Sequence, residues 1–174
     1  MTNFINNFLE KNAIDSLSTL LTSSDENELT KSSAVIAKSF GTDTQFDSAS
    51  GNETKLLTSF KKNLTLLIQK TWVEEFDISL KEQVLYKLDQ YVTAAEEKKW
   101  NSSYNTFIQI IDDVTYLMFG TQSKSEEFTN YALRIDPEFG IFCWFVKSLP
   151  AKNDWSEEKN RIVQLLGIFF LANF

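Results

Sequence analysis

Apolar side chains recur every three to four residues along most of the chain, which is the spacing that gathers them on one face of an α-helix. No stretch alternates polar and apolar residues for long enough to form an amphipathic strand. Only five Gly and two Pro are available for the turns of a β-sandwich or barrel. The segments with helical spacing are 4–21, 26–40, 55–72, 79–95, 101–119, 123–135, 137–149 and 155–172. The pattern predicts an all-α fold of seven to eight helices, arranged as a bundle or a short stack of helical hairpins.

Capping boxes predict where several of these helices begin. In such a box a Ser or Asp side chain, and a Glu three residues later, accept hydrogen bonds from backbone N–H groups that the first helical turn leaves without partners. The candidates are Ser23…Glu26, Ser79…Glu82, Ser123…Glu126 and Asp154…Glu157, with Asn101 or Ser102 as a simple cap and Asp136-Pro137 as a further start. Gly41, Gly120 and Pro150 mark expected helix ends.

Residues 41–54 (GTDTQFDSASGNET) have a different composition from the rest of the chain. They contain one large apolar residue, Phe46, among many turn-forming residues. This composition predicts a polar linker. We expect it to join an N-terminal helical pair, 1–40, to a helical core, 55–174, within one compact domain, since 174 residues suffice for one hydrophobic core of ordinary size.

Residues 139–146 (FGIFCWFV) are eight consecutive apolar or glycine residues. Lys147 ends this run, and a membrane-spanning helix needs about 20 apolar residues. The C-terminal run 162–174 is interrupted by Gln164 and is also too short. The two runs predict a central pair of buried helices, with a buried strand over 139–146 as the alternative. Cys143 lies between Phe142 and Trp144, so we expect a core cysteine and not a reactive thiol.

The absence of histidine excludes the usual nucleophile–base pairs and every His-ligated metal site. Paired carboxylates that bind a divalent metal are the remaining catalytic option. The pairs are Glu74-Glu75, Glu96-Glu97, Asp112-Asp113, Glu126-Glu127 and Glu157-Glu158. Adjacent side chains on a helix point about 100° apart, whereas metal sites between helices use carboxylates three or four residues apart. We therefore assign no catalytic, cofactor-binding or metal-ligating residue and expect no cofactor.

A stripe of lysines is the one candidate binding feature. Lys55, Lys62 and Lys70 fall within about 80° of one another on a helical projection, with Leu66 among them and no acid between Thr54 and Val73. This lysine stripe, defined as Lys55, Lys62, Leu66 and Lys70, suits an acidic protein surface or a second copy of the chain. Four lysines in residues 55–70 of a protein of net charge −7 give little counterion release on a nucleic acid, so we expect no nucleic-acid partner.

Residues 100–119 align without gaps with residues 155–174. Trp, Asn, Gln and the final Phe are identical, and the intervening apolar positions are similar. The similarity has two explanations: a helical hairpin that recurs after 55 residues, or two amphipathic helices that each begin near a Trp.

These observations favour a non-enzymatic helical protein that acts through protein–protein contacts, as an adaptor, regulator or inhibitor. The alternative is a metal-dependent hydrolase that uses clustered carboxylates. A single cysteine leaves no pair for an intramolecular disulfide, and the N-terminal residues lack the basic start and apolar run of a secretory signal. We therefore expect a cytoplasmic protein without a membrane segment.

Overall fold

The computed structural model describes residues 12, 15–38, 46, 52–70, 77–119, 142 and 145–172. Every secondary-structure element in these residues is helical and none is a strand, so the expected all-α class is confirmed. The helices with both ends described are α2 (Glu26–Lys38), α3 (Asn52–Lys70), α4 (Asp77–Glu96), α5 (Trp100–Phe119) and α8 (Glu157–Ala172). Residues 15–22 and 145–148 are also helical. The helix expected over 123–135, together with Cys143 and Trp144, lies outside the described residues.

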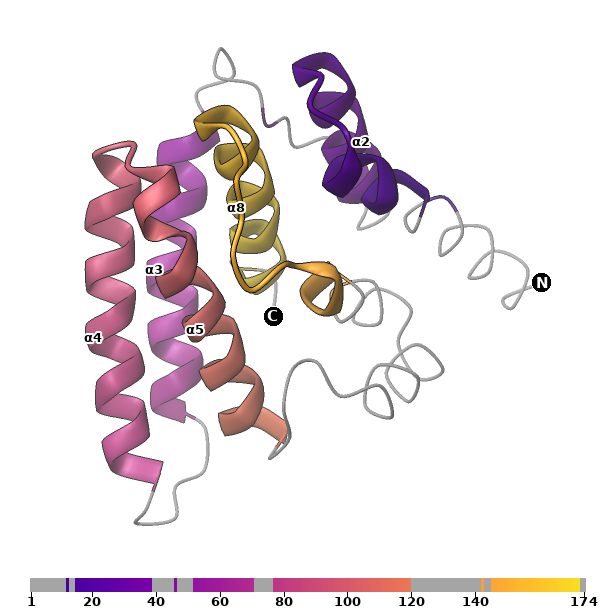
Figure 1. Ribbon diagram of the computed structural model, residues 1–174. Coiled ribbons are helices and arrows are strands. Elements are labelled where there is room, and N and C mark those ends of the chain that lie inside the picture. The colour runs from indigo at the N-terminus through magenta and orange to yellow at the C-terminus, as the bar shows by residue number, and fades with distance from the viewer. Residues whose placement is uncertain are drawn as a thin grey trace, which may run out of the picture.

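Helix α8 lies in the middle of the fold. It packs against α2, α3 and α5, and α4 packs on the far side of α3 and α5 (Figure 1). Every residue from Lys159 to Leu171 is buried. A helix that is apolar around most of its circumference reaches low exposure only when neighbours surround it, which is what the sequence of its second half predicts.

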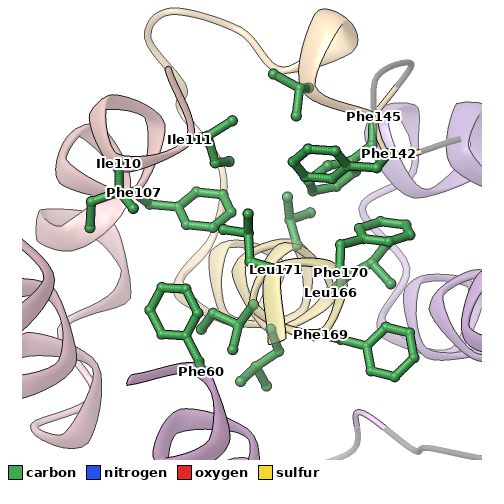
Figure 2. Close-up of a cluster of buried hydrophobic side chains, with 14 of the residues drawn as sticks. Phe60, Phe107, Ile110, Ile111, Phe142, Phe145, Leu166, Phe169, Phe170 and Leu171 are labelled. Carbon is green, nitrogen blue, oxygen red and sulfur yellow. The ribbon is translucent and has the colours of Figure 1, made fainter. Parts of the chain in front are cut away.

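Aromatic side chains fill the space between α8 and its neighbours. Figure 2 shows Phe60, Phe107 and Ile111 on one side of α8 and Phe142 and Phe145 on another. Phe170 packs against both of these last residues, with ring centroids 5.6 and 5.5 Å apart. The described residues of the run 139–146 are Phe142, Phe145 and Val146, and all three are core, as expected. Residues 145–148 are helical.

Gly167 allows α8 to approach α5 closely. A Cβ atom at this position would lie 2.2 Å from Cζ of Phe107 and 3.2 Å from Cε1 of Phe145. The glycine is therefore required by packing, in spite of the roughly 1 kcal/mol by which Gly disfavours a helix interior relative to Ala.

The observed helix starts differ from three of the predicted capping boxes. Helix α2 is capped by Asp25, whose Oδ1 accepts the N–H of Asn27 at 2.8 Å, and not by Ser23. Helix α4 begins at Asp77, so Ser79 lies inside it. Helix α8 is capped by Ser156, whose Oγ accepts the N–H of Lys159 at 3.2 Å, and not by Asp154. In each case another good capping residue stands within two positions, and the sequence does not rank such neighbours.

The C-terminal end of the expected linker is helical. Helix α3 begins at Asn52, so residues 52–54 belong to it. Phe46, the one large apolar residue of the segment, is buried and packs edge-on against Phe169, with ring centroids 6.1 Å apart. Its carbonyl oxygen accepts a hydrogen bond from Arg161 Nη2 at 2.7 Å. Phe46 thus anchors this segment to α8.

A short turn joins α4 to α5 and makes them antiparallel neighbours. Lys98 has φ 60°, and its N–H donates to the carbonyl of Ala95 while the N–H of Lys99 donates to that of Ala94. This pair of bonds is a Schellman motif, which closes the C-terminal end of α4.

Among the helices of the described residues, none combines the length and the apolar character needed to cross a bilayer.

Candidate interaction surface

The residues of the predicted lysine stripe all lie on the exposed outer face of α3. Lys55, Lys62 and Lys70 are exposed, and 42% of Leu66 is accessible to solvent. The opposite face of the helix carries Leu57, Phe60, Leu64 and Ile68, which are buried. The helical period therefore divides α3 as the sequence predicts, into an apolar inner face and a cationic outer face.

Two neighbouring helices hold α3 in this orientation. On the α8 side, Asn63 Nδ2 donates to the carbonyl oxygen of Ala172 at 2.8 Å. On the α4 side, Phe60 packs edge-on against Tyr91, and Lys61 Nζ lies 3.1 Å from Asp89 Oδ1. The stripe lies between these two contacts, so α3 presents it to solvent on a supported helix.

A groove of about 490 Å³ runs along the α4 side of the stripe. Lys62 and Leu66 line it, whereas Lys55 and Lys70 do not. The remaining lining residues are Leu57, Thr58, Lys61, Thr65, Val92 and Glu96. Sequence reasoning missed Val92 and Glu96 because they belong to α4, and only the packing of two helices brings them beside α3.

The groove has an apolar floor and charged walls. Leu57 and Val92 are nearly inaccessible to solvent, while Leu66 beside them is exposed. Lys61 and Lys62 contribute positive charge on α3, and Glu96 contributes negative charge on α4. The ion pair of Lys61 with Asp89 is exposed on both sides, so it contributes little to stability.

Helix α3 is locally cationic within an acidic protein. It carries four lysines and one acid, Glu53, whereas the whole chain has a net charge of −7. Glu53 does not face the stripe, because it pairs with Arg161 of α8 at 3.1 Å. The outer face of α3 is therefore more favourable for acidic groups than the net charge of the protein suggests.

Three carboxylates of the predicted pairs, Asp113, Glu157 and Glu158, have structural partners. Asp113 forms an ion pair with Lys87 at 2.8 Å, and Glu158 forms one with Arg161 at 2.7 Å. Glu157 Oε1 accepts the backbone N–H of Trp100 at 2.6 Å and so caps the start of α5. Within the part of the chain that the structure describes, no three Asp, Glu, Cys or His side chains gather into a group that could hold a metal ion. Glu74-Glu75 and Glu126-Glu127 lie outside that part.

The first turns of α8 hold the surrounding elements together. Lys159 Nζ donates to the carbonyl oxygens of Leu21 and Ser23 at 2.9 and 2.7 Å, and lies 4.9 Å from the ring centre of Trp155. Burial lowers the pKa of Lys159 from its ordinary value because it disfavours the charged ammonium. These contacts join the N-terminal helical residues to α8, so the role of Lys159 is structural.

Gln164 is the centre of a buried polar cluster. Its Oε1 accepts hydrogen bonds from the Tyr91 hydroxyl and the Ser103 hydroxyl, each at 2.9 Å, and its Nε2 donates to the Trp100 carbonyl at 2.7 Å. Burial raises the pKa of Tyr91 well above its ordinary value. The amide thus has partners for both of its ends, which is typical of a structural residue inside a core.

No family model, curated protein or solved structure matches this chain.

Proposed function

We propose that the protein is a non-enzymatic, cytoplasmic interaction protein of the adaptor, regulatory or inhibitor type, which binds a protein partner through the outer face of α3. One observation carries the proposal: an exposed Leu66 stands among lysines, beside a groove with an apolar floor, on an otherwise acidic protein. Apolar anchors inside a polar rim are the usual anatomy of a protein–protein interface.

Two features of the surface make nucleic acid a poorer fit. Helix α3 has four lysines and no arginine, so few counterions would be released on binding. Among the described residues, the large exposed aromatic side chains are those of Tyr86 and Tyr116, which belong to α4 and α5 and do not line the groove.

Affinity capture from the native cells, followed by mass spectrometry, tests the proposal. The tagged full-length chain is compared with Leu66→Glu, and the matched control is Val35→Glu on α2, because Val35 has a nearly equal exposure of 44%. We expect a partner that the wild type and the Val35 variant retain and the Leu66 variant loses. Both variants should change the free energy of unfolding by less than about 0.5 kcal/mol, since neither side chain is buried. If every captured protein is retained equally by the three chains, the proposal is wrong.

A further inference from the structure

The lysines of the α3 face are spaced two helical turns apart. Lys55, Lys62 and Lys70 follow one another at intervals of seven and eight residues, so the set spans about 22 Å along the helix at 1.5 Å per residue. A second helix lying alongside α3 would present its own side chains with the same periodicity. Carboxylates two turns apart on such a helix would face the three lysines together.

The groove beside these lysines has room for apolar side chains. Its volume of about 490 Å³ lies in the range of pockets that bind small ligands or a few side chains. Leu57 and Val92 form its floor, and Leu66 forms part of its rim. An amphipathic helix that docks in a groove does so by inserting apolar residues at intervals of three, four and seven positions.

From these two features we infer that the α3–α4 groove binds an acidic amphipathic helix of about four to five turns, which inserts apolar side chains beside Leu66 and places carboxylates against Lys55, Lys62 and Lys70. The inference rests on the proposed function and specifies the partner's chemistry. Charge complementarity selects this occupant, because α3 carries a positive excess and its outer face bears no acid. Glu96, on the α4 wall, opposes part of that attraction.

Fluorescence anisotropy with two designed peptides tests the inference. The acidic probe is a labelled amphipathic helix of about five turns with Leu on one face and Glu flanking it, and the second probe has Lys in place of every Glu. We expect the full-length protein to bind the acidic probe at least about tenfold more tightly than the basic one, and the affinity to fall as salt is raised. Equal binding of the two probes, or no binding of the acidic one, would overturn the inference.

Matched variants assign the binding to the groove. Lys62→Glu should weaken binding of the acidic probe by about tenfold, whereas Lys31→Glu, the same charge change on the exposed surface of α2, should alter it by less than about twofold. Leu66→Ala should weaken it by about fivefold, and Glu96→Gln should strengthen it by about twofold. Circular dichroism shows that each variant is folded. Equal effects of the Lys62 and Lys31 changes would contradict the assignment.

Two further outcomes identify other occupants. Tighter binding of single-stranded oligo-dT than of the acidic probe, unaffected by Leu66→Ala, would mark the face as a general polyanion site and overturn the inference. A dimer in sedimentation that dissociates on Lys62→Glu and excludes the acidic probe would assign the face to a second copy and overturn it as well. A native partner that is lost with Leu66→Glu but retained with Lys62→Glu would leave the proposed function standing and refute only the acidic-helix inference.

Discussion

Helix α5 and the segment that contains α8 align without gaps, yet they place the same residue types in opposite environments. Asn105 and Gln109 are exposed on α5. Their counterparts on α8, Asn160 and Gln164, are fully buried and hydrogen-bonded to side chains of other segments. Identical residues therefore do not make equivalent contacts in the two helices.

The difference follows from where each helix lies in the bundle. Helix α8 has neighbours on several sides, while α5 keeps one side open to solvent, as the 46% exposure of Tyr116 shows. Leu171, which aligns with Tyr116, is 1% exposed. The starts differ too, because Trp100 is the first residue of α5 whereas Trp155 precedes α8 by two residues. Within the described residues, the aligned positions therefore do not have equivalent packing.

The largest expected effect separates the two aligned glutamines. Gln164→Ala should lower the free energy of unfolding by about 3–5 kcal/mol, because it leaves the Tyr91 hydroxyl and the Trp100 carbonyl without this partner and opens a cavity. Gln109→Ala on exposed α5 should change it by less than about 0.5 kcal/mol. Urea unfolding measures both values. Similar losses in the free energy of unfolding at the two positions would contradict the buried environment of Gln164 and the exposed one of Gln109.

A second prediction concerns Gly167, which aligns with Asp112. Gly167→Ala should destabilise the protein by about 1–3 kcal/mol, because the added Cβ would lie 2.2 Å from the ring of Phe107 and overpack the contact between α8 and α5. Phe107→Leu removes part of the obstructing ring. In a double-mutant cycle, the Gly167 change should therefore cost less in the Phe107→Leu background than in the wild type. If the two substitutions lower the free energy of unfolding additively, the close approach of α8 to α5 at Gly167 is contradicted.

The smallest effect compares Tyr104 with its aligned residue, Lys159. Both contact Trp155, and burial favours the neutral form of each, so it raises the pKa of Tyr104 and lowers that of Lys159. Above the ordinary tyrosine pKa of about 10, the unfolded chain releases a proton that buried Tyr104 retains, so stability falls by up to about 1.4 kcal/mol per pH unit. Lys159 has the opposite sign, because just below its ordinary pKa the unfolded lysine still holds a proton that the folded one has lost.

Urea unfolding between pH 9 and 11 measures these slopes. Tyr104→Phe should make the alkaline loss of stability shallower, and Lys159→Met should make it steeper. Tyr91, whose pKa burial also raises, contributes to the wild-type slope in the same direction as Tyr104. Tyr116→Phe serves as the control, because it removes the same hydroxyl group from a tyrosine that is 46% exposed. The interpretation fails if the three variants and the wild type share one slope.

Much of the fold was predictable because it depends on periodicity. The apolar spacing placed α3, α4, α5 and α8 in their approximate positions, and it correctly identified the described residues of the run 139–146 as core. Helix starts were less predictable, as Ser23, Ser79 and Asp154 show, because several capping residues compete within two positions. The sequence placed the start of α5 within one residue, but its predicted caps, Asn101 and Ser102, lie inside the helix. The observed cap, Glu157, was beyond local reasoning because it lies 57 residues away from Trp100.

The candidate surface was likewise predictable in part from the sequence and in part only from the tertiary structure. The sequence by itself determined that one face of a helix carries Lys55, Lys62, Leu66 and Lys70. The reason is that an α-helix rotates by a fixed angle per residue, so the spacing of residues decides which side chains share a face. Only the tertiary structure decided that α4 stands beside that face and that Val92 and Glu96 complete the groove. It also decided that Gln164 is buried while Gln109 is not. Burial depends on how many neighbours surround a helix, and contacts between segments far apart in the chain set that number.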